Sequence, residues 1–219
     1  WQHPRFPGKP WDAGNWIVKQ KPMVEYPQEA TLFALAAQRL AGKPFTVSEY
    51  NHPAPLDSQA ACVPMLSAFA AAQNWDGIWL YTYSHSQPDW GRSELNSFFD
   101  IDSNPAKWGF MRSGADIFRR RGVGVLGHRS EVALTEPANS LVVGLAQHQR
   151  RFGSDLFGAM ASEYSMGRSN LMTVQLSALL AGTTTIRPVL GTNARMAWGA
   201  EDGKGGLFLV ESEASRVVV

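Results

Sequence analysis

The 219-residue sequence has very little cysteine and almost no net charge, and both features restrict its function. One cysteine, Cys62, excludes an internal disulfide and a cysteine-based metal site, and its Ala-rich surroundings predict a small core residue. Twenty basic and 19 acidic residues give a formal charge of +1, without the basic surface of a nucleic-acid-binding protein. No apolar run reaches the ~20 residues that cross a bilayer, so no membrane association is expected.

Motifs for cofactors and several catalytic classes are also missing. The sequence contains no His/Cys ligand set, phosphate-binding loop or serine-nucleophile elbow. Gly122-Val123-Gly124 lacks the preceding strand and following helix of a dinucleotide motif. Asp100 and Asp102 could line a rim or bind a structural cation, but this spacing is a weak metal signal. We therefore expect no cofactor and no catalytic metal.

The first half of the chain alternates helical and extended patterns after a loop rich in proline and glycine. Short connections between such elements indicate parallel strands joined by crossover helices, whose C-terminal ends open on the same side. The predicted elements are the loop Trp1–Gln28, the helices Glu29–Leu40, Ser58–Gln73 and Pro105–Arg121, and the strands Phe45–Tyr50 and Ile78–Tyr83. Asn104 is expected to cap the last helix and Gly122 to end it.

After Gly122 the sequence changes to short apolar runs separated by Gly, Asn and Asp turns, which predicts an all-β module. We therefore divide the chain into residues 1–121 and 122–219. Within the second part, Leu171–Leu180 fits either a helix or a buried strand. The predicted strands are Val123–Leu126, Glu131–Leu134, Ser140–Ala146, Thr183–Leu190, Arg195–Trp198, Leu207–Val210 and Arg216–Val219.

Glu49 is the candidate catalytic residue, because it lies at the C-terminal end of a predicted parallel strand, directly before a proline-rich loop. Rigid strand ends position catalytic groups in α/β barrels. The alternative is a salt-bridged or solvated residue at a strand end. Aromatic and polar side chains near this end suit a pyranose, whose apolar faces stack on rings and whose hydroxyls form hydrogen bonds. The candidate substrate-binding residues are Asn51, His52, Tyr83 and His85, with His3 joining from the first loop.

Each of these histidines could instead be a hydrogen-bonding residue of a loop. Alternation along the strand Ile78–Tyr83 predicts that Trp79, Tyr81 and Tyr83 share one face, and part of this aromatic set could belong to the core.

Lys43-Pro44-Phe45-Thr46-Val47-Ser48-Glu49-Tyr50-Asn51-His52-Pro53 and the run Trp75–Ser84 resemble strands seven and eight of the clan A (β/α)8 glycoside hydrolases. The resemblance is strongest to bacterial β-galactosidase-like and cellulase-like enzymes and covers about residues 1–121. It implies the C-terminal portion of a TIM barrel, with Glu49 as the nucleophile of a retaining mechanism. Residues 197–198 and 206–210 resemble, more weakly, the β-sandwich domain that follows such barrels.

The sequence departs from this family because the acid/base glutamate of strand four and strands one to six have no counterpart. A complete barrel needs ~250 residues, so we expect a fragment that is inactive alone, or one completed by a second chain or copy. The resemblance implies an oligo- or polysaccharide substrate and a secreted or periplasmic enzyme. The alternative is a non-catalytic carbohydrate-binding or interaction protein that uses the barrel remnant as a scaffold.

Overall fold

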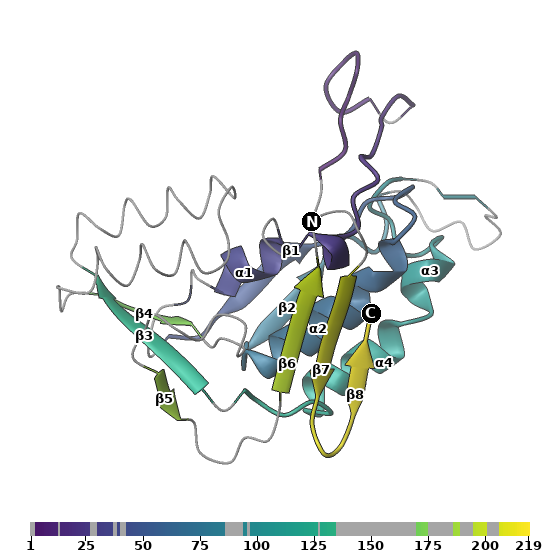
Figure 1. Ribbon diagram of the computed structural model, residues 1–219. Helices are drawn as coiled ribbons and strands as arrows, with labels where there is room; N and C mark the ends of the chain where they lie inside the picture. The colour runs from purple at the N-terminus through teal and green to yellow at the C-terminus, as the bar shows by residue number, and fades with distance from the viewer. Residues whose placement is uncertain are drawn as a thin grey trace.

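A computed structural model describes residues 3–12, 14–26, 30–36, 39, 43–85, 94–95, 97–126, 128–134, 170–174, 186–188, 195–200 and 206–219. Within these residues no helix is long and apolar enough to cross a membrane. Figure 1 shows a helical layer with a sheet in front of it and a long loop that projects from the first residues.

The first half contains the predicted parallel unit. Strand β1 (Thr46–Tyr50) is followed by the 3-10 turn η3 (Gln59–Ala61), helix α2 (Cys62–Ala72) and strand β2 (Gly77–Leu80). β1 and β2 pair in parallel, which confirms the predicted strand–helix–strand arrangement. The remaining elements of this half are η1 (Met23–Glu25), α1 (Thr31–Ala36), α3 (Pro105–Trp108) and α4 (Met111–Arg119).

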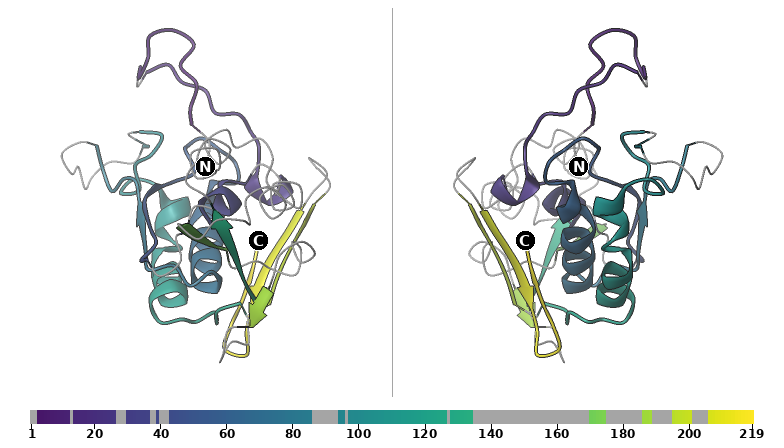
Figure 2. Two further views of the ribbon diagram at one scale, coloured as in Figure 1. Left: turned by 90° about the vertical axis from the view of Figure 1, so that its left-hand side faces the viewer. Right: turned by 90° about the vertical axis from the view of Figure 1, so that its right-hand side faces the viewer.

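Helix α2 is the centre of the core. All of its residues except Pro64 are buried, which is typical of a helix that is packed on every side. The β1–β2 pair, helix α4 and the C-terminal strands β7 and β8 all pack against it. Figure 2 shows α2 and α4 side by side, with the C-terminal sheet as a separate layer. α2 therefore connects the sheet that carries Glu49 to the rest of the molecule.

Antiparallel strands follow Gly122, as predicted. One sheet has the order β6-β7-β8 and the other has the order β4-β3-β5. The bounds are β3 His128–Leu134, β4 Asn170–Val174, β5 Ile186–Pro188, β6 Arg195–Ala200, β7 Gly206–Glu211 and β8 Arg216–Val218. β4 shows that the start of the ambiguous segment Leu171–Leu180 is extended; the predicted strand Ser140–Ala146 lies outside the described residues. Phe208, Val210 and Val217 share one hydrophobic core with α2, across the boundary predicted at residue 121.

Several boundaries differ from those predicted, and the predicted strand Val123–Leu126 is not formed. β2 ends at Leu80, because the chain then bonds elsewhere: Ile101 N donates to the carbonyls of Thr82 and Tyr83. The predicted helix Pro105–Arg121 is split into α3 and α4. Its capping by Asn104 is confirmed, since the Asn104 side chain accepts a hydrogen bond from Lys107 N at 3.4 Å. At the other end Arg121, and not Gly122, takes the left-handed conformation, with φ 54°.

Candidate functional site

A bulge in β1 sets the direction of Glu49. Val47 pairs with Ile78 and Tyr50 pairs with Leu80, so Ser48 and Glu49 together oppose the single residue Trp79. Strict alternation after Val47 would turn Glu49 toward the core and Tyr50 away from it. The extra residue reverses this: Val47 and Tyr50 are buried, whereas Ser48 and Glu49 are exposed. The side chain of Glu49 makes no hydrogen bond or ion pair with the described residues, which disfavours a purely structural salt bridge.

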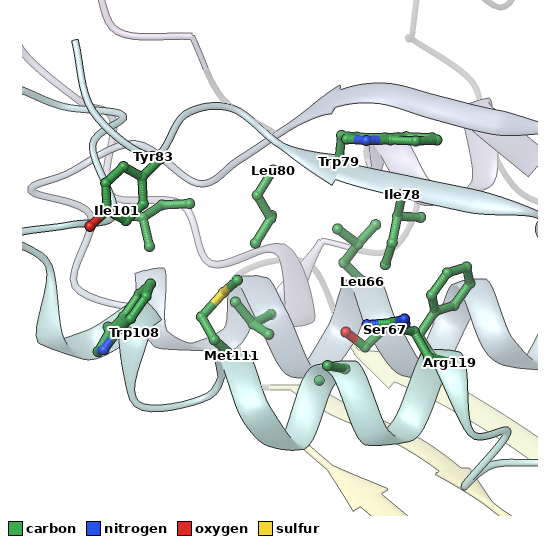
Figure 3. A pocket seen from close by; sticks show the side chains of 14 residues that line it. Leu66, Ser67, Ile78, Trp79, Leu80, Tyr83, Ile101, Trp108, Met111 and Arg119 are labelled. Carbon is green, nitrogen blue, oxygen red and sulfur yellow. The ribbon is translucent and has the colours of Figure 1, made fainter.

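Trp79 lies on the same open face of the sheet as Glu49. Ile78 and Leu80 point toward the helices and Trp79 points to the opposite side, as Figure 3 shows. Its side chain is 56% exposed, which is unusual for a residue of its size on a strand. The ring passes over Gly77, where an added Cβ would lie 2.5 Å from Cζ3 of the indole. A glycine therefore leaves room for a flat aromatic surface next to the bulge.

Asn51 ties the two strand ends together, and His52 is a buried support. Asn51 Nδ2 donates to the carbonyl of Tyr81 and, at 2.7 Å, to that of Phe99. His52 is 2% exposed, and its Nε2 lies 3.3 Å from the hydroxyl of Tyr50. Burial lowers the pKa of His52 well below its usual value, so the ring is neutral at physiological pH. Asn51 and His52 lie two and three positions after Glu49, but their polar groups point into the protein.

The second strand end carries a chain of three polar side chains. Asp100, whose side chain is completely buried, lies 2.5 Å from Nδ1 of His85 through Oδ1. The other ring nitrogen, Nε2, is 3.2 Å from the hydroxyl of Tyr81. His85 and Tyr81 are both exposed, so this chain runs from a buried carboxylate to the surface.

Tyr83 lies on the helix side of β2, apart from Tyr81. Its ring meets that of Trp108 at a centroid distance of 6.1 Å. Both rings border a pocket of about 290 Å³ between β2 and the helices α2 and α4 (Figure 3). Side chains that line this pocket are mostly apolar and include Leu66, Ile78, Leu80, Met111 and Phe118. Strict alternation would place Tyr83 on one face with Trp79 and Tyr81. Because the chain bends after Leu80, the alternation ends before it reaches Tyr83.

Aromatic contacts hold the opening loop near these strand ends. His3 meets Trp11 at a ring distance of 5.0 Å and Phe99 at 6.0 Å, and Phe99 in turn meets Tyr81 at 5.8 Å. The loop is closed by paired backbone hydrogen bonds between Arg5 and Ile17. His3 is exposed, and its Nδ1 lies 3.1 Å from the carbonyl of Pro4. The loop therefore borders the same end of the sheet, with His3 connected to it through Phe99.

A buried lysine lies behind the site. Lys107 is 1% exposed, and its Nζ has no hydrogen-bond partner among the described residues. Burial lowers its pKa to about 8, although the charge of Asp100 acts in the opposite direction.

Burial also raises the pKa of Cys62 to about 11, so the thiol is protonated and inert in the folded protein. No three His, Cys, Asp or Glu side chains converge to hold a metal ion within the described part of the chain.

Sequence reasoning identified the two strand ends but missed Trp79, Tyr81 and Asp100 as candidate residues. For Trp79 the signal was present, because Ile78 and Leu80 flank it with apolar side chains suited to the helix side. Asp100 is 15 residues from His85, and only the folded chain joins them.

Comparison of this chain with protein-family models, curated proteins and solved structures found no match. A functional assignment therefore rests on the residues described above.

Proposed function

We propose that this chain carries the nucleophile half of the active site of a retaining glycoside hydrolase, with Glu49 as the nucleophile. The observation that supports this most is the bulge in β1, which turns an unpaired carboxylate to the open face at the C-terminal end of a parallel strand. Bulges often re-aim side chains next to active sites. A carboxylate in a regular strand at this position would face the core.

The proposed reaction splits glycoside cleavage into two steps. Glu49 attacks the anomeric carbon and forms a glycosyl-enzyme as the bond to the leaving oxygen breaks. A second carboxyl group about 5 Å away protonates that oxygen, and then removes a proton from the water that releases the sugar. This group, with the remaining strands of a (β/α)8 barrel, comes from a second chain or copy. The substrate is an oligo- or polysaccharide.

The neighbours of Glu49 support a sugar as substrate. Trp79 and Tyr81 present exposed aromatic surface, 56% and 38% exposed, which suits the C–H face of a pyranose. The polar chain that begins at Tyr81 offers hydrogen bonds to sugar hydroxyls. Such a mixture of apolar surface and a few fixed polar groups is typical of a small-molecule site.

The proposal is tested by trapping the nucleophile. The native protein that contains this chain is incubated with 2-deoxy-2-fluoro-β-glucosyl and β-galactosyl fluorides, and the labelled peptide is found by mass spectrometry. We expect the label on Glu49 and its loss in Glu49→Gln. Asp57→Asn, at an exposed carboxylate in the loop after β1, is the control and should keep the label. A label on another residue, or none, refutes the nucleophile assignment.

The same variants separate catalysis from binding alone. If the chain is a non-catalytic carbohydrate-binding protein, Glu49→Gln binds saccharides like the wild type and neither protein hydrolyses an aryl glycoside. A retaining glycosidase instead loses hydrolysis in Glu49→Gln, and azide restores it in Glu49→Ala by replacing the missing nucleophile.

A further inference from the structure

Asp100 holds His85 at two points. Oδ1 of the buried carboxylate contacts ring Nδ1 at 2.5 Å, and Oδ2 accepts the backbone N–H of His85 at 3.2 Å. Such a pair, a buried carboxylate that orients a partly exposed imidazole, fixes both the position and the tautomer of the ring. The side chain of His85 is 40% exposed and that of Asp100 is not exposed at all, so the carboxylate is the fixed end of the arrangement.

The tautomer determines what Tyr81 can do. A carboxylate only accepts hydrogen bonds, so Nδ1 of His85 carries the ring proton and Nε2 of the neutral ring is an acceptor. The Tyr81 hydroxyl lies 3.2 Å from Nε2, a position from which it can donate its proton to the neutral ring. The phenolic oxygen has one proton only, and its lone pairs remain available to accept a hydrogen bond from outside.

Ring contacts and backbone bonds fix the location of this acceptor. Tyr81 packs edge-on against His85 at 5.4 Å and against Phe99 at 5.8 Å. Its N–H donates to the carbonyl of Tyr50 at 3.1 Å, and its own carbonyl accepts from Asn51. Tyr50 and Asn51 are the two residues after Glu49, so the phenol belongs to the same strand end as the proposed nucleophile.

We propose that Asp100 and His85 are positioning residues that hold the Tyr81 hydroxyl as a hydrogen-bond acceptor for a hydroxyl group of the saccharide. The inference rests on the proposed function for the identity of its ligand. The hydrogen-bonded relay Asp100–His85–Tyr81 itself does not depend on that function. An oriented acceptor distinguishes a sugar that carries a hydroxyl at the facing position from a deoxy sugar that lacks it.

The first experiment tests the relay without any ligand. Long-range ¹H–¹⁵N NMR spectra of the ¹⁵N-labelled full chain report the tautomer of each histidine. We expect His85 in the Nδ1–H form in the wild type and in Tyr81→Phe. In Asp100→Asn we expect a loss of this preference, because an amide can also donate to Nδ1. A wild-type ring in the Nε2–H form, or one that averages between forms, overturns the relay.

The second experiment tests recognition. Binding of methyl β-D-glucopyranoside, methyl β-D-galactopyranoside and their monodeoxy analogues to the full chain is measured by saturation-transfer NMR titration. We expect one monodeoxy analogue to bind about tenfold more weakly than its parent. Tyr81→Phe should weaken the parent by the same factor and leave that analogue unaffected. His85→Gln, at an exposed position, repeats the test if Asp100→Asn fails to fold, and Tyr26→Phe is the control.

Equal binding of the parent glycosides to the wild type and Tyr81→Phe, or no binding to the wild type, overturns the recognition step. Failure of the proposed function is recognised separately, by the absence of a fluoroglycoside label on Glu49.

Discussion

Gly114 is the position where the structure predicts a mutational effect of opposite sign to that expected from sequence alone. It lies buried in α4 where this helix meets α2. An added Cβ would lie 2.5 Å from Cγ1 of Val63 and 2.8 Å from Oγ of Ser67. Ordinary contact requires about 3.5–4.0 Å, so Gly114→Ala must separate the two helices or displace both side chains by about 1 Å.

The size of the effect follows from two opposing terms. Alanine in place of a helical glycine stabilises a helix by about 1 kcal/mol. Overpacking a core contact costs about 1–3 kcal/mol. Because Val63 and Ser67 belong to the fully packed helix α2, we expect the second term to dominate. Gly114→Ala should lower the free energy of unfolding by about 1–2 kcal/mol, measured by urea denaturation followed by far-UV circular dichroism.

Two further variants identify the cause. In a Val63→Ala background Cγ1 is gone, so Gly114→Ala should cost at least about 1 kcal/mol less than in the wild type. Ser113→Ala, at the exposed neighbouring position of α4, should change stability by less than about 0.5 kcal/mol. An increase in stability in Gly114→Ala would refute the close packing of α4 on α2, and with it the wall of the pocket in Figure 3.

Three other outcomes follow from the site and its support. Burial raises the pKa of Cys62 from 9.0 to about 11, so at pH 8 it should have about 100-fold less thiolate than an unburied thiol. Dithionitrobenzoate should therefore react with Cys62 only as fast as the chain unfolds. Rapid reaction with the native chain would contradict the burial of Cys62. Folded Lys107 has a pKa of about 8 and unfolded Lys107 one of about 10.5, so between these values the unfolded state binds more protons and the free energy of unfolding rises with pH. Relative to Lys107→Met, urea denaturation should show this free energy increasing by roughly 3 kcal/mol from pH 7.5 to 10.5. Parallel pH profiles of the two proteins would contradict this. Gly77→Ala should displace the exposed ring of Trp79 and change the free energy of unfolding by less than about 1 kcal/mol. It should also weaken saccharide binding, as Trp79→Ala does. A large loss of stability would show that the ring is held in the core.

Local patterns predicted most of the elements around the site. The Ala-rich apolar run around Cys62 located α2, and Asn104 with Pro105 marked the start of α3. β6, β7 and β8 were each located to within two residues, because Gly and Asp turns bound short β-branched and aromatic runs. These signals depend on neighbours in sequence, so they are visible without the fold.

Long-range features could not be predicted in this way. The early end of β2 depends on hydrogen bonds from Ile101, and the capture of His85 by Asp100 depends on how the segment after β2 folds back. The contact of β7 and β8 with α2 joins residues more than 130 positions apart, and no periodicity in either element specifies its partner. For Glu49, the strand end was predicted from sequence, but its exposure depends on the pairing of Val47 with Ile78 and of Tyr50 with Leu80.

The bulge in β1 also makes the location of the acid adjustable. In a regular strand, moving a carboxylate by one residue sends it through the sheet to the other face. Here positions 48 and 49 both face outward while Val47 and Tyr50 keep the core unchanged. Exchanging Ser48 and Glu49 would therefore slide the charge along the open face by about 3.3 Å, one strand step. Selection could use this freedom to match the nucleophile to sugars of different size without disturbing the hydrophobic core.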